Sequence, residues 1–224
     1  MTVDAVLEVA AKRSFASALA WPGWSRGGKS PDDAIAALVS YGPRYAPVPE
    51  RAGLPFEVPD SVDAVAISER LRGGSGTEFG IPSTPARAEE EPIGDDLGRL
   101  LALLRAAWDT FDEAMTAAEG RRLATGPRGG GRDLARIVDH VRDAEVAYLS
   151  KLGSRAPATS DRPPAERLEA LRSAFVEALT AIAGGEPVPT PSRTQKLWSP
   201  RYAVRRTAWH VLDHAWELQD RIEG

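Results

Sequence analysis

Length, composition and charge limit the functions open to this chain. Its 224 residues are enough for one large domain or two small ones with a buried core. The formal net charge is -4 and both signs are mixed along the chain, so we expect no nucleic-acid partner. Cysteine is absent, which excludes disulfides, a thiolate metal site and a protein thiol nucleophile. Any thiol chemistry would therefore need a substrate that carries the sulfur.

Targeting and membrane segments are not evident in the sequence. No basic-then-apolar leader opens the chain, and no apolar run approaches the ~20 residues that a membrane span needs. We therefore expect a soluble cytoplasmic protein with no membrane partner.

Residues 1–72 predict a small α/β unit. Val3–Val9 and Ser14–Ala20 partly alternate in polarity on either side of a short polar turn, which predicts a β-hairpin. The pair Gly27-Gly28 is expected to continue the loop that ends the second strand. Val62–Glu69 predicts a further strand.

A helix is predicted to begin directly after Ser30. This serine can cap the helix, Pro31 suits its first position, and Asp33 completes an arrangement close to a capping box. The surrounding segment resembles the HicB-like fold over LAWPGWSRGGKSPDDAIAAL, from Leu19 to Leu38. The resemblance implies a strand that ends in a Pro-Gly turn and a capped helix that packs on the sheet. HicB antitoxins usually add a DNA-binding module, and nothing after residue 72 resembles one, so we favour a packing or substrate-covering role.

Residues 73–92 are the best candidate for a domain boundary. Their sequence, GGSGTEFGIPSTPARAEEEP, is rich in Gly, Pro, Ser and Glu, which is typical of a linker or long loop. A lid that covers a site is the alternative.

The remainder, residues 93–224, predicts four long helices with apolar side chains at three-and-four spacing. They are expected from about Asp95 to Glu119, from about Asp133 to Leu152, from Pro163-Pro164 to Gly184, and from Ser199 toward the C-terminus. Short to moderate connections favour an up-down-up-down four-helix bundle. The expected fold class is therefore α+β, with a small α/β domain followed by a helical bundle.

Two of the three histidines in the chain are spaced for shared ligation. His210 and His214 lie four residues apart in the last predicted helix, so both imidazoles can reach one ion. His140 is expected to point inward from the second helix. Three neutral nitrogen ligands from two helices would leave at least one coordination position open, as in catalytic metal sites.

The alternative is that His210 and His214 lie on a solvated face of their helix. Their neighbours are mostly large apolar side chains, namely Trp209, Val211, Leu212, Ala215, Trp216 and Leu218. Such a helix is expected to be buried, and a buried histidine without a partner or a metal is costly. The metal interpretation is therefore favoured. Imidazole ligands suit zinc, which we expect first, and also nickel or iron.

The histidine-bearing segments resemble the DinB superfamily of four-helix bundles. The resemblance is carried by IVDHVRDAE around His140 and by WHVLDHAWE, which contains His210 and His214, and it extends over about residues 93–224. It implies that these three histidines bind a divalent metal. It also implies a homodimer, as in many members, and the transfer or use of low-molecular-weight thiols such as mycothiol or bacillithiol.

Three further residues are candidates for the site. Glu217 lies three residues past His214, and Asp143 lies three residues past His140. Either carboxylate could accept the second N–H of a metal-bound imidazole, or could form a surface ion pair instead. Arg206, one turn before the histidine pair, could bind an anionic group of the substrate or could be solvated.

The predicted function is that of a metal-dependent enzyme that activates a small thiol for attack on an electrophile, as a thiol-dependent S-transferase or isomerase. Its expected partners are the thiol and the electrophile. A non-catalytic metal-binding or regulatory protein is one alternative, and an iron-dependent oxidase is another. The same ion could also activate water for hydrolysis.

Overall fold

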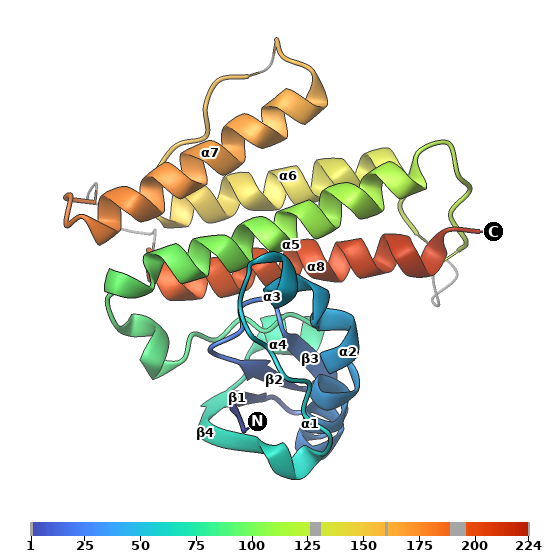
Figure 1. The fold of residues 1–224 in the computed structure, drawn as a ribbon, viewed down its shortest axis with the longest axis vertical. Coiled ribbons are helices and arrows are strands. Elements are labelled where there is room, and N and C mark those ends of the chain that lie inside the picture. The colour runs from blue at the N-terminus through green and yellow to red at the C-terminus, as the bar shows by residue number, and fades with distance from the viewer. Residues whose placement is uncertain (1, 126–130, 160, 189–195, 224) are drawn as a thin grey trace.

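The chain folds into a mixed α+β structure, as expected (Figure 1). The computed structural model describes residues 2–125, 131–159, 161–188 and 196–223. A four-stranded sheet with short helices occupies one end of the molecule, and four long helices occupy the other. Within the described residues, none of the helices combines the length and apolar composition that crossing a membrane requires.

The sheet has the strand order β3-β2-β1-β4. Its strands are β1 (Val3–Val9), β2 (Ser14–Ala18), β3 (Ser25–Gly28) and β4 (Val65–Arg72). The predicted hairpin is confirmed, because β1 and β2 pair antiparallel. β3 pairs antiparallel with β2, and β4 pairs parallel with β1. The predicted last strand is also present, but it begins at Val65, after a single 3₁₀ turn over Val62–Ala64.

The prediction of a loop at Gly27-Gly28 is wrong, since both residues belong to β3. At both positions the backbone packs too closely on its neighbours for a larger residue. A Cβ at Gly27 would lie 2.8 Å from Phe15 Cζ, and a Cβ at Gly28 would clash with the backbone nitrogen of Ala34. Glycine inside a strand often marks such a close approach. The sequence pattern alone does not separate this use of glycine from a flexible loop.

The predicted capped helix is α1 (Pro31–Ser40), and it covers the β2–β3 side of the sheet (Figure 1). Ser30 Oγ accepts the backbone N–H of Asp33, and the Asp33 carboxylate accepts the N–H of Ser30, both at 3.1 Å. This reciprocal pair is a complete capping box. Two short helices follow, α2 (Gly42–Tyr45) and α3 (Pro47–Arg51).

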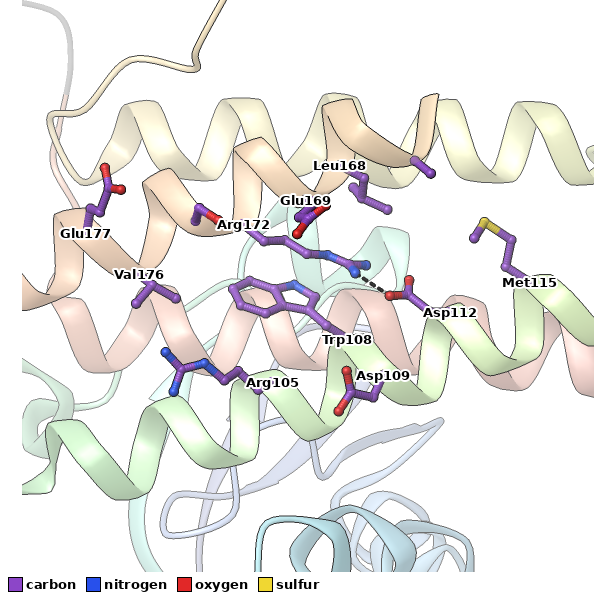
Figure 2. Close-up of a pocket in the computed structure, with 12 residues that line it drawn as sticks. Arg105, Trp108, Asp109, Asp112, Met115, Leu168, Glu169, Arg172, Val176 and Glu177 are labelled. Carbon is purple, nitrogen blue, oxygen red and sulfur yellow. Dashed lines mark hydrogen bonds and ion pairs between the residues drawn. The ribbon is translucent and has the colours of Figure 1, made fainter. Parts of the chain in front are cut away.

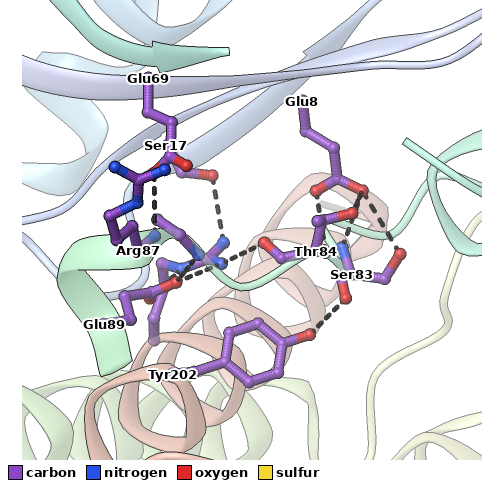
Figure 3. A network of polar contacts seen from close by, with 10 residues as sticks. Glu8, Ser17, Glu69, Ser83, Thr84, Arg87, Glu89 and Tyr202 are labelled. Carbon is purple, nitrogen blue, oxygen red and sulfur yellow. Dashed lines mark hydrogen bonds and ion pairs between the residues drawn. The ribbon is translucent and has the colours of Figure 1, made fainter. Parts of the chain in front are cut away.

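The segment predicted as a linker is packed between the sheet and the last helix (Figure 3). It contains α4 (Ser75–Phe79) and a 3₁₀ turn over Arg87–Glu90. The buried carboxylate of Glu8 on β1 accepts both the backbone N–H (3.1 Å) and the hydroxyl (2.8 Å) of Thr84. The buried Arg205 donates to both oxygens of Glu89, at 2.5 and 3.0 Å. These contacts argue against a freely moving tether or lid, while the predicted domain boundaries stay a prediction.

The four long helices are α5 (Leu97–Ala118), α6 (Leu134–Lys151), α7 (Pro164–Ala183) and α8 (Pro200–Arg221). Each begins and ends within a few residues of its predicted bounds. Ser199, directly before α8, makes no side-chain capping hydrogen bond, and its buried Oγ has no partner among the described residues.

The direction of α7 corrects the predicted up-down-up-down order. Arg172 on α7 contacts Asp112 on α5, and the later Phe175 contacts the earlier Trp108, so α7 runs antiparallel to α5. α8 runs in the same direction as α5, as its Arg201 pairs with Asp96 at the start of α5. α6 runs antiparallel to α8, because the later Tyr148 contacts the earlier Arg206 while His140 contacts His210. α6 and α7 therefore run the same way, and the order is up-down-down-up (Figure 1).

The connection between α6 and α7 explains the difference. Its twelve residues, 152–163, can span up to about 40 Å when extended, whereas the eighteen residues of α6 are about 27 Å long. The chain can therefore return to the far end of the helices before α7 begins. The expectation of antiparallel neighbours holds only for short connections.

A single hydrophobic core joins the sheet to the helices and includes Leu7 of β1, Trp24 before β3, and Leu103 and Leu212 of the long helices. The tightest contact involves Gly23, whose φ is +95°: a Cβ there would lie 2.6 Å from Leu212 Cδ1. Positive φ and this close approach both require glycine. The Pro-Gly turn thus packs directly on α8.

The buried Arg205–Glu89 pair should be much more important for stability than an exposed pair. Arg205→Ala would leave the Glu89 carboxylate buried and uncompensated, so we expect a loss of about 3–5 kcal/mol in the free energy of unfolding. Arg51→Ala breaks a similar contact with Glu113 at the surface and should cost less than about 1 kcal/mol. Urea unfolding of both variants measures the difference, and equal losses would contradict it.

Candidate metal centre

The three histidines meet between α6 and α8. His210 and His214 lie one turn apart on α8 and are 7% and 9% exposed, so the alternative of a solvated face is wrong. His140 lies opposite them on α6 and is half-buried, which leaves the cluster partly accessible. Most residues of α8 are buried, because α5 and α6 pack on it in the helical layer and the α/β unit packs on it from below (Figure 1). Gln219 and Asp220, near its C-terminal end, are exposed.

The spacing of the three rings fits a shared ion. Each histidine offers one ring nitrogen, and these three nitrogens lie within 4.8 Å of one another. Nε2 of His140 and Nε2 of His210 are 3.2 Å apart. Two nitrogens that ligate a tetrahedral zinc at 2.0–2.1 Å are about 3.3 Å apart. The observed separation suits either an N–H···N hydrogen bond or joint ligation of one ion.

Glu217 orients the third ring. Its Oε2 lies 2.8 Å from Nδ1 of His214, and its Oε1 accepts a hydrogen bond of 2.6 Å from Arg221. The hydrogen bond from His214, followed by the charge of Arg221, lowers the pKa of the Glu217 carboxyl. An ionised Glu217 therefore fixes the proton of His214 on Nδ1 and leaves Nε2 as the nitrogen available to an ion.

Burial favours the uncharged form of two of the rings, those of His210 and His140. It lowers the pKa of His210 well below the ordinary 6.5, and the neighbouring His214 and Arg206 lower it further. Burial and the nearby His214 also lower the pKa of His140. Neutral imidazole is the form that binds metal ions, so the site is prepared for ligation at neutral pH.

The protons on the rings would differ between a hydrogen-bonded histidine pair and a metal site. A hydrogen bond between His140 and His210 needs a proton on one Nε2, whereas ligation by both needs neither. Nδ1 of His210 is buried and has no partner within the described chain. Buried polar atoms are normally satisfied, so this cluster differs from an ordinary packed core.

Comparisons with protein families, with curated proteins and with solved structures found no match to this chain. The DinB-like and HicB-like assignments therefore stay predictions, and functional inference depends on the site itself.

Arg206 is buried beside the centre, so the solvated alternative for this residue is wrong. One guanidinium nitrogen donates to the hydroxyl of Tyr148 at 3.0 Å, and the group lies over the ring of Trp209, 4.8 Å from its centroid. Its Nη1 is buried with no partner among the described residues. The Tyr148 ring lies 5.8 Å from the His210 ring. An unsatisfied cationic donor is thus held close to the histidines.

Asp143 occupies a different environment from Glu217. Its side chain is 70% exposed and contacts the guanidinium of Arg142 at 2.9 Å. The described residues show no hydrogen bond between it and His140. Of the two carboxylates singled out from the sequence, only Glu217 contacts a histidine of the cluster.

Sequence reasoning missed Tyr148 and Arg221. Both carry a signal of helical spacing: Arg221 lies four residues after Glu217, and Tyr148 lies eight residues, about two turns, after His140. Extending each histidine face by one or two more turns would have found them.

Acidification should destabilise the folded chain through these histidines. Because the pKa of His210 and of His140 is below 6.5 in the folded chain, the unfolded chain binds more protons over that interval. Stability is therefore greatest above pH 6.5 and falls as the pH drops below it. Urea unfolding of metal-free protein at about pH 7.5 and about pH 5.5 measures this. The loss should be smaller in His210→Asn, and an equal loss would assign the effect to other groups.

Proposed function

We propose that this chain is a DinB-like metalloenzyme that uses a low-molecular-weight thiol, as an S-transferase or an isomerase. The observation that carries the proposal is the convergence of three imidazoles from two helices, with one nitrogen each within 4.8 Å of the others. Three protein ligands leave a coordination position for a substrate, which is typical of catalytic rather than structural sites.

His140, His210 and His214 would hold the ion, for which zinc is the first choice and nickel or iron the alternatives. A bound zinc-like ion would stabilise a substrate thiol as its thiolate, the nucleophilic form, at neutral pH. Because the chain has no cysteine, no protein thiolate competes for that position.

The residues around the histidines have separate roles in this proposal. Glu217 fixes the orientation and the proton of His214. Arg206, with its spare Nη1 donor, would bind a carboxylate or a similar anionic group of the thiol or of the electrophile. Tyr148 holds Arg206 in place through its hydroxyl.

A non-catalytic metal-binding protein is the second candidate, and one observation favours it. Both oxygens of Glu217 are engaged, by His214 and Arg221, and burial raises the pKa of the Tyr148 hydroxyl. Neither group is a free base at neutral pH. Transfer of a thiolate needs no base beyond the metal, whereas hydrolysis and enolisation do. The lack of a free base at these two groups therefore disfavours hydrolysis and enolisation and leaves thiolate transfer and non-catalytic metal binding as the candidates.

Metal content tests the site. We expect about one divalent ion per chain after tag-free purification, and loss of it in His210→Ala. Glu217→Gln should weaken zinc binding by about 10–100-fold, because it removes the carboxylate that orients His214. Asp143→Asn is the matched control and should bind zinc normally, since Asp143 contacts Arg142 instead. Unchanged metal content in His210→Ala would show that the histidines are not the ligands.

Thiol binding to the cobalt-substituted protein tests the chemistry. A thiolate ligand adds a charge-transfer absorption in the near ultraviolet, so mercaptosuccinate and 2-mercaptoethanol can both be titrated optically. Arg206→Gln should weaken the dianionic mercaptosuccinate by about tenfold and leave 2-mercaptoethanol almost unchanged. Arg142→Gln, at the surface, is the control. If neither thiol changes the spectrum of a cobalt-loaded protein, the non-catalytic candidate is favoured.

A further inference from the structure

A groove lies between α5 and α7, and none of the three histidines lines it (Figure 2). Its volume is about 770 Å³, within the range of small-molecule pockets. Side chains of both helices line it, among them Trp108 and Asp112 of α5 and Leu168, Arg172 and Val176 of α7. It is therefore separate from the candidate metal centre.

The groove exists because α7 crosses the other helices at an angle (Figure 1). Phe175 meets Trp108 edge-on, with ring centroids 6.1 Å apart. Beside this contact, Trp108, Leu168 and Val176 line the opening (Figure 2). The opening thus offers an aromatic and aliphatic floor to a ligand.

The charge of the lining is unbalanced. The lining contains two guanidinium groups and four carboxylates, those of Asp109, Asp112, Glu169 and Glu177. One of the guanidinium groups, that of Arg172, is already opposed by Asp112 at 2.6 Å and by the buried Glu145 at 3.8 Å. The groove therefore carries excess negative charge, most of it at an exposed rim on α7.

Polar atoms beneath the groove lack partners. Glu145 is 1% exposed; one of its oxygens accepts a hydrogen bond of 2.7 Å from the indole of Trp108, and the other has no partner within the described chain. Oδ1 of Asp112 is likewise buried and unpartnered there. Nε and Nη2 of Arg172 also lack hydrogen-bond partners among the described residues, and its charge is opposed by these same carboxylates. Buried polar atoms are normally satisfied, so the polar contacts beneath the groove are incomplete.

We propose that the groove between α5 and α7 binds an organic amine, with its ammonium group among the carboxylates and its apolar body along Trp108, Leu168 and Val176. The excess negative charge selects a cation, because Asp109, Glu169 and Glu177 line the groove and are exposed. The aromatic and aliphatic floor selects an apolar chain or ring over a small inorganic cation. This inference does not depend on the proposed function.

Calorimetric titration with 2-phenylethylamine tests the proposal, with 3-phenylpropanoate as a probe of similar shape and opposite charge. We expect the amine to bind at least tenfold more tightly than the acid. The double variant Glu169→Gln/Glu177→Gln should weaken the amine by about five- to tenfold. Glu166→Gln, an exposed carboxylate on α7 outside the groove lining, should leave it unchanged.

These substitutions lie at exposed positions, so loss of folding is not expected to obscure the result. Val176→Trp, which fills the groove, should abolish amine binding with an unchanged circular dichroism spectrum. Equal binding of amine and acid would overturn the proposal, as would no binding of the amine at millimolar concentration. It would also fail if Val176→Trp changed the sedimentation of the protein while the amine did not bind, because the groove would then be an interface between copies of the chain.

Discussion

The structure depends on the burial of most of α8. On one side His210 and His214 face α6, and on another Leu212 packs against the Pro-Gly turn at Gly23. Polar side chains on such a helix must find partners, and Arg205 finds Glu89 in the segment that follows the sheet. The α/β unit is therefore part of what buries the helix that carries two histidines of the candidate metal centre.

The same burial sets the chemistry of the centre. Exclusion of water lowers the pKa of His210 and so keeps a nitrogen lone pair available. It also makes an unsatisfied cation such as Arg206 unusually receptive to an anion, because little water competes for its donor. Glu217, shared between His214 and Arg221, is a positioning residue and not a free base. The centre is thus better suited to binding and activating a ligand than to moving protons.

The long connection between α6 and α7 determines how α7 packs on α5. Because that connection is long, α7 runs parallel to α6 and crosses α5 at an angle. Arg172 bridges the resulting gap to Asp112 and Glu145, and the ion pairs leave several polar atoms without partners. A short connection would instead have favoured an α7 that runs antiparallel to α6.

Local patterns in the sequence determined the long helices, the hairpin, the capping box at Ser30 and the shared face of His210 and His214, because each depends on residues a few positions apart. The tertiary structure alone decided that His140 reaches that pair, that Glu217 but not Asp143 contacts a histidine, and that Arg206 is buried. These outcomes depend on which helix faces meet, and therefore on the route of the connections and the packing of side chains far apart in the chain, which periodicity within one element does not encode.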